Sequence, residues 1–109
     1  MAGQLGRGEV RLYRLSPEQK QRPVVVLTSD TAIPYLTRVT VAPITSTVRG
    51  VPSEVALDIE DGMKNRCVVN LHNVITVEQR NLGARVAILD SRKMNRVCQA
   101  LAFALNCGS

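Results

Sequence analysis

Apolar residues in this chain occur mainly in short runs, several of which alternate with polar residues, and this pattern is typical of β-strands. It predicts strands over residues 9–15, 24–28, 38–42, 54–59, 66–71, 74–77 and 85–89. The second run consists of Val and Leu and ends in Thr, which suits a strand buried on both faces. In the fourth run the alternation is expected to turn Val55, Leu57 and Ile59 toward the core.

The residues between these runs are polar or contain Pro and Gly, so they predict loops and turns. We expect the longest loop at 45–52, a turn at Asp61-Gly62 and a single helical turn at 78–82. Pro43 has no N–H group for a strand ladder, and a bend is expected there. Residues 1–8 predict a flexible tail.

From Asp90 onward the apolar period becomes helical, and either Asp90 or Ser91 is suited to cap the first turn. The predicted apolar face consists of Met94, Val97, Cys98, Leu101 and Leu105. Three cations lie off this face and are expected to be solvated, namely Arg92, Lys93 and Arg96. Short strands followed by a terminal helix predict a mainly β protein, a small barrel with a helix packed on it. At 109 residues the chain is expected to be one domain.

Charge and composition restrict the possible partners. The net charge of +5 favours an anionic partner, while the low aromatic content of 3% argues against binding single strands by base stacking. No apolar run approaches the roughly 20 residues that span a bilayer. The N-terminal residues lack an apolar signal segment, so a cytoplasmic protein is expected. Cys67, Cys98 and Cys107 match no zinc spacing and are expected to be reduced, without a metal or other cofactor.

The candidate chemistry lies in two blocks, residues 21–28 and 41–55. Arg22 precedes Pro23, whose fixed φ restrains the entry of the arginine into its strand. A guanidinium can hold a phosphate through two parallel hydrogen bonds, and the hydroxyls of residues 45–47 are neutral donors. One histidine excludes a two-histidine ribonuclease, and no metalloprotease, Gly-rich phosphate or nucleophile-elbow motif is present. Phosphodiester chemistry here would therefore use the 2′-hydroxyl of RNA as nucleophile, without a metal.

These two blocks resemble the signature of the MazF/PemK-like toxins, small ribonucleases of bacterial toxin–antitoxin systems. The resemblance extends from Gly8 to Leu89 and includes the segments 49–50, 54–57, 68–71 and 75–77. It implies an SH3-like, CcdB-like barrel that forms a homodimer. It also implies a toxin that cuts single-stranded RNA, leaves 2′,3′-cyclic phosphate and 5′-hydroxyl ends, and so inhibits translation and growth. The implied second partner is a MazE-like antitoxin that is acidic and partly disordered.

By the same resemblance Arg22 and Thr45 are the catalytic residues. An arginine side chain keeps its proton at physiological pH, so we expect Arg22 to stabilise charge on the phosphate rather than to act as a base. The candidates for contacts with RNA are Glu18, Lys20, Ser46, Thr47, Arg49, Asn70 and His72. The loop 15–22 is shorter than is usual in the family, and Glu18 matches its acidic residue only approximately. A structural role for His72 stays open beside a role as RNA contact or proton donor.

Two alternatives use the same architecture. A non-catalytic barrel that poisons a protein such as DNA gyrase would not need the pair Arg22 and Thr45. A plain RNA-binding module would bind with a steep dependence on salt and leave the RNA intact.

Overall fold

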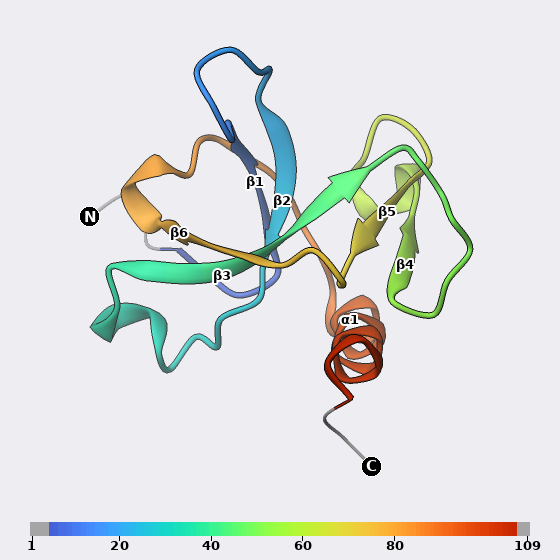
Figure 1. Cartoon of the computed structure of the whole chain (residues 1–109). Coiled ribbons are helices and arrows are strands. Elements are labelled where there is room, and N and C mark those ends of the chain that lie inside the picture. The colour runs from blue at the N-terminus through green and yellow to red at the C-terminus, as the bar shows by residue number, and fades with distance from the viewer. Residues whose placement is uncertain (1–4, 107–109) are drawn as a thin grey trace.

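The computed structural model describes residues 5–106, which form a bent sheet with one α-helix packed against it (Figure 1). In chain order the elements are β1 (Glu9–Tyr13), β2 (Arg22–Val26), the 3₁₀ turn η1 (Ile33–Tyr35), β3 (Arg38–Thr45), β4 (Glu54–Leu57), the 3₁₀ turn η2 (Ile59–Asp61), β5 (Cys67–Asn70), β6 (Ile75–Glu78), the 3₁₀ turn η3 (Gln79–Asn81), β7 (Arg85–Ile88) and α1 (Ser91–Leu105).

The strand order is β4-β5-β3-β2-β1-β7, and β6 also pairs with β3. Because β4 and β7 lie at opposite ends of this order, the sheet is an open half-barrel. The prediction of a mainly β fold with a C-terminal helix is confirmed, and each predicted strand is present with shifted ends. The helical turn expected at 78–82 is η3.

β3 belongs to three ladders and is the strand that shapes the molecule. On one edge its residues 41–43 pair antiparallel with β2, with Pro43 opposite Val24. On the other edge its residues 38–41 pair with β6, and its last two residues, Ile44 and Thr45, pair with β5. Figure 1 shows β3 running from the β6 side of the molecule, past β2, to the β5 side. The strand continues through Pro43, where a bend was expected, and directly afterwards the ladder with β2 ends and the ladder with β5 begins on the other edge.

The core lies on both sides of β2. Val25 is fully buried in the larger cluster, between the sheet and α1, together with Leu57, Leu71 and Val97. Val24 and Val26 point the other way, into a second cluster. The prediction that this strand is buried on both faces is therefore confirmed.

Two predictions about the edges of the core are wrong. Ile59 is 72% exposed, because β4 ends at Leu57 and the chain turns into η2 instead of continuing the alternation. The tail expected at 1–8 is wrong for residues 5–8, since Leu5 is buried in the second cluster and the Gly8 N–H donates to the Val26 carbonyl at 2.8 Å. Residues 1–4 lie outside the described part of the chain.

The helix α1 begins as expected, with Asp90 Oδ1 accepting from the Lys93 N–H at 2.8 Å. It packs through Met94, Val97 and Ala100, which are three residues apart and form a narrow stripe. Cys98 and Leu105 were predicted for this face but are exposed. Cys67 and Cys98 are free thiols, and the third cysteine lies outside the described residues. Between residues 5 and 106, no helix has the length and apolar character needed to cross a membrane.

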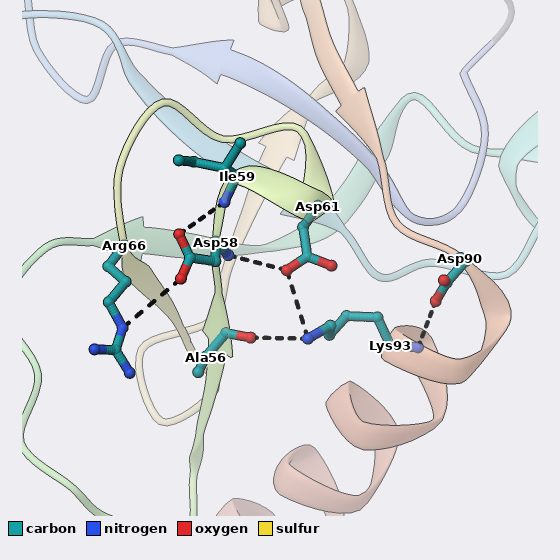
Figure 2. A network of polar contacts seen from close by, with 7 residues as sticks. All are labelled: Ala56, Asp58, Ile59, Asp61, Arg66, Asp90 and Lys93. Carbon is teal, nitrogen blue, oxygen red and sulfur yellow. Dashed lines mark hydrogen bonds and ion pairs between the residues drawn. The ribbon is translucent and has the colours of Figure 1, made fainter.

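Lys93 was predicted to face solvent, and this is wrong. Its side chain is only 17% exposed and reaches back to the segment after β4 (Figure 2). Its Nζ donates to the Ala56 carbonyl at 3.1 Å and lies 3.5 Å from Asp61 Oδ2. The same carboxylate oxygen accepts from the Asp58 N–H at 2.9 Å. One lysine of α1 therefore fixes η2, which leads into the segment 62–66.

Candidate active site

The site exists because β2 and β3 separate at their ends. Continuing the pairing of Val24 with Pro43 by two residues would put Arg22, the first residue of β2, opposite Thr45, the last of β3. The ladder between β2 and β3 ends before this position, and Thr45 pairs on its other edge with Val68 of β5. The diverging strands leave open space between them, and both residues line it.

Three neighbouring grooves meet at Thr45. The widest, of about 830 Å³, is lined on the β2–β3 side by Arg22, Thr45, Ser46 and Thr47 and is closed by His72 and Asn73. A second, of about 400 Å³, shares Arg22, Thr45 and Ser46 and extends to the segment after η2. A third, of about 280 Å³, runs from Thr45 and Thr47 to Arg49 and Asn70. Arg22 and Thr45 thus lie at the junction of a branched surface that an extended chain could follow.

The guanidinium of Arg22 is exposed at the mouth of two grooves. Among residues 5–106 no carboxylate forms an ion pair with it. Its charge is therefore available to an anionic ligand, and its planar shape suits two parallel hydrogen bonds to a phosphate.

The hydroxyl of Thr45 is oriented by its own loop. Its Oγ1 accepts a hydrogen bond from the Thr47 N–H at 3.1 Å, and the side chain is half-buried. Since a hydroxyl has one proton to donate, this contact leaves that proton for a ligand in the groove. Thr45 can therefore serve as a neutral donor beside the cation of Arg22.

Glu54 shapes the turn that presents Arg49 to the third groove. Its Oε1 accepts from the Gly50 N–H at 2.9 Å, and its Oε2 accepts from the Arg49 N–H at 3.1 Å. Partial burial raises the pKa of the Glu54 carboxyl, but hydrogen bonds from the backbone of Arg49, Gly50 and Val51 and the nearby charge of His72 outweigh this, and the net pKa is lowered.

We expect Glu54→Gln to lower the melting temperature slightly at neutral pH, because the neutral amide accepts these hydrogen bonds more weakly. A folded-state pKa below the unfolded value means that the stabilisation is complete above the unfolded pKa and is lost as the pH falls through the folded one. The difference in melting temperature between variant and wild type should therefore vanish in acid. Glu60→Gln, at an exposed carboxyl in η2, is the matched control. A difference that persists at low pH would contradict the role given to the charge.

His72 is held from two sides at the rim of the widest groove. Its Nδ1 shares a hydrogen bond with the Ser53 Oγ, and its backbone N–H donates to Asn70 Oδ1 at 3.1 Å. Ser53 and Asn70 are buried, whereas His72 is exposed. Asn70 lines the third groove, but its Oδ1 already serves the fold by holding the His72 backbone.

The structure does not bring all the sequence candidates together. Arg22, Thr45, Ser46, Thr47 and His72 line the widest groove, and Arg49 and Asn70 line the adjoining third groove. Glu18 and Lys20 are exposed on the loop between β1 and β2 and are not among the residues that line these three grooves.

Sequence reasoning missed the far wall of the second groove, which is formed by Lys64, Asn65 and Arg66. The signal was a polar, basic triplet that follows the Asp61-Gly62 turn after one residue, and its members were treated only as a connection and as the start of the predicted strand 66–71. The wall follows η2, where Asp61 contacts Lys93 and Asp58 contacts Arg66 (Figure 2). In the part of the chain that is described, no three His, Cys, Asp or Glu side chains are grouped so as to hold a metal ion.

The fold and the groove define a small half-barrel β protein with an exposed arginine and a hydroxyl at a branched groove, and comparison with known proteins identifies the family. The model of the PemK-like, MazF-like toxin of type II toxin–antitoxin system matches residues 6–105. The chain is 43% identical over 102 residues to the probable endoribonuclease MazF5 of Mycobacterium tuberculosis, with 93% of each chain covered. The chain therefore belongs to the PemK-like, MazF-like toxin family.

Solved structures agree with this assignment. The Mycobacterium tuberculosis toxin MazF-mt6 superposes with a TM-score of 0.83 at 34% identity, covering 93% of this chain and 99% of that one. An endoribonuclease in complex with its cognate antitoxin, from a mycobacterial species, superposes with a TM-score of 0.87 at 24% identity, covering 97% of this chain and 99% of that one. The second likeness supports the fold alone.

Proposed function

We propose that this MazF-type toxin endoribonuclease cuts single-stranded RNA without a metal ion. In the proposed reaction the 2′-hydroxyl attacks the adjacent phosphorus and leaves a 2′,3′-cyclic phosphate and a 5′-hydroxyl. The observation that supports this most is the meeting of Arg22 and Thr45 at one groove, with the guanidinium unpaired among residues 5–106. The relatives' activity supports the reaction class.

The roles follow from the charge that develops at phosphorus. Arg22 would hold two non-bridging oxygens and stabilise the additional negative charge of the transition state. Thr45 would donate a hydrogen bond from its hydroxyl to the same oxygens, since its Oγ1 is already oriented by the Thr47 N–H. The backbones of both residues are held at strand ends, so both side chains start from the mouth of the same groove.

The branched grooves suit an extended strand better than a duplex. Basic side chains lie beyond the junction on both sides, with Lys64 and Arg66 along the second groove and Arg49 along the third. These can follow successive phosphates, while Ser46, Thr47 and Asn73 offer polar groups to base edges. Single-stranded RNA exposes those edges, which paired RNA hides in its deep groove. We propose that sequence selectivity arises on these walls.

The test is incubation of the purified protein with a long single-stranded RNA of mixed sequence in EDTA, followed by mapping of the product ends. We expect cuts at a restricted set of sequences, with 5′-hydroxyl and 2′,3′-cyclic phosphate ends. RNA that is bound but stays intact would instead support the plain binding module. RNA that is neither bound nor cut, with growth still arrested on expression, would support poisoning of a protein target. Cleavage that stops in EDTA would reject the metal-free mechanism.

We further propose that the protein forms a homodimer and is neutralised by an acidic, partly disordered antitoxin peptide of the MazE type. Exposed apolar side chains on the edge strand β7, Val86 and Ile88, support a self-association surface. An acidic peptide suits the net charge of +5 and Arg22, which forms no ion pair within the described range 5–106, and a structural neighbour is a complex with its cognate antitoxin. Sedimentation of the free protein tests the homodimer. Sedimentation of the toxin co-expressed with a MazE-type antitoxin tests the complex.

A further inference from the structure

Cleavage of the phosphodiester needs a proton for the leaving 5′-oxygen, and neither Arg22 nor Thr45 is suited to supply it. Guanidinium and aliphatic hydroxyl groups release protons only at high pH, whereas imidazole exchanges a proton near neutrality. A general acid works best when it exchanges its proton near the working pH. The one histidine of the chain, His72, lines the same groove as Arg22 and Thr45.

His72 is held by more specific hydrogen bonds than an ordinary surface histidine needs. Its ring is exposed, yet Nδ1 shares a hydrogen bond with a serine hydroxyl that is itself buried, with Ser53 only 5% exposed. Ser53 is anchored in turn, because its carbonyl accepts from the Leu71 N–H at 2.9 Å. On the other side Asn70 fixes the His72 backbone. One buried polar residue thus holds the imidazole of His72 and another holds its backbone.

The hydrogen bond to Ser53 also distinguishes the two ring nitrogens. If Nδ1–H donates to the Ser53 Oγ, that proton stays in place whether the ring is charged or neutral, and Nε2 is the nitrogen that gains and loses a proton. No rotation of the ring is then needed between the two states. This arrangement is what a residue that repeatedly delivers a proton to one place requires.

We propose that His72 is the general acid of the reaction and that Ser53 is its positioning residue, an inference that rests on the proposed ribonuclease function. As the 2′-oxygen bonds to phosphorus and the bond from phosphorus to the 5′-oxygen breaks, Nε2–H of the charged ring transfers its proton to that leaving oxygen. The proton of the 2′-hydroxyl passes to water. The neutral ring takes up one proton from solvent before the next turnover, so protons balance over the cycle.

The test replaces the leaving oxygen with sulfur. After the cleavage site has been mapped, a short oligonucleotide is made with a 5′-bridging sulfur at the scissile bond and compared with the ordinary oxygen substrate. A thiolate leaves without protonation, so loss of a general acid should not slow this substrate. We expect His72→Ala to cut the oxygen substrate at least about 100-fold more slowly than wild type, and the sulfur substrate at close to the wild-type rate.

Arg22→Ala is the matched comparison, because loss of charge stabilisation should slow both substrates alike. Ser53→Ala is expected to lower the cleavage rate of the oxygen substrate by a smaller factor, and to leave the rate of the sulfur substrate unchanged. In a chain that already carries His72→Ala, the Ser53 change should not lower the rate further. Thermal melts of each variant separate these effects from unfolding.

Equal slowing of both substrates by His72→Ala, or no slowing of the oxygen substrate, would overturn the acid role while leaving the ribonuclease proposal intact. Failure of the wild type to cut the oxygen substrate would overturn the ribonuclease proposal, and this one with it.

Discussion

Arg22→Ala is expected to lower the rate of RNA cleavage by about 10²- to 10³-fold, the usual effect of removing one donor that stabilises transition-state charge. The fold should survive, because the side chain is exposed and lies at the first position of β2, outside the buried run. Single-turnover cleavage measures the rate, and a thermal melt measures folding. Growth arrest on expression should disappear with the activity.

Arg22→Lys and Arg14→Ala are the controls for this result. Lysine keeps the charge but cannot offer two parallel hydrogen bonds, so a rate between those of wild type and the alanine variant is expected. Arg14 is an exposed arginine directly after β1 and lines none of the three grooves, so its loss should leave the rate unchanged. Persistent toxicity of a folded Arg22→Ala protein would refute the mechanism.

The second large effect is expected in stability, from Asp61→Ala. Removing this carboxylate leaves the largely buried ammonium of Lys93 with the Ala56 carbonyl as its one remaining contact among the described residues, and it also removes a cap of η2. We expect a loss of about 2 kcal/mol in the free energy of unfolding. Because the segment 62–66 loses its anchor, KM for RNA should also rise while kcat changes little.

A double variant tests the cause of that loss. If the unpaired ammonium is responsible, adding Lys93→Met should restore part of the stability, since an apolar side chain of similar length has no charge to desolvate. Denaturant unfolding of the two single variants and the double variant gives the coupling. Glu60→Ala, at the neighbouring exposed carboxyl of η2, should have little effect. Independent, additive effects of the Asp61 and Lys93 changes would show that the contact is unimportant.

The positions of the proposed catalytic pair could be predicted because their signal is local. Arg22 stands before Pro23 at the start of an apolar run, and Thr45 stands at the end of another, so both could be placed at strand ends without knowledge of the fold. What the sequence did not show is why they meet. That depends on the ladder between β2 and β3 ending at Pro43 while β3 continues to pair with β5 on its other edge, and these contacts join residues far apart in the chain.

Lys93 and Ser53 illustrate what periodicity leaves out. The helical pattern placed Lys93 off the apolar stripe of α1, but it cannot show that Asp61 and the Ala56 carbonyl lie across from that position. Ser53 belonged to a loop by every local criterion, and its importance depends on a histidine 19 residues later. Periodicity shows on which face of its helix or strand a residue lies. It does not show which polar groups the tertiary fold brings close to that face.

The place of β1 between β2 and β7 has a consequence for when the toxin becomes active. The strand that supports Arg22 is completed only by β7, and the larger core is closed only by α1, so both depend on the last quarter of the chain. A nascent chain whose C-terminal residues are still inside the ribosome lacks these partners. We therefore expect the groove to form only after β7 and α1 have left the ribosome.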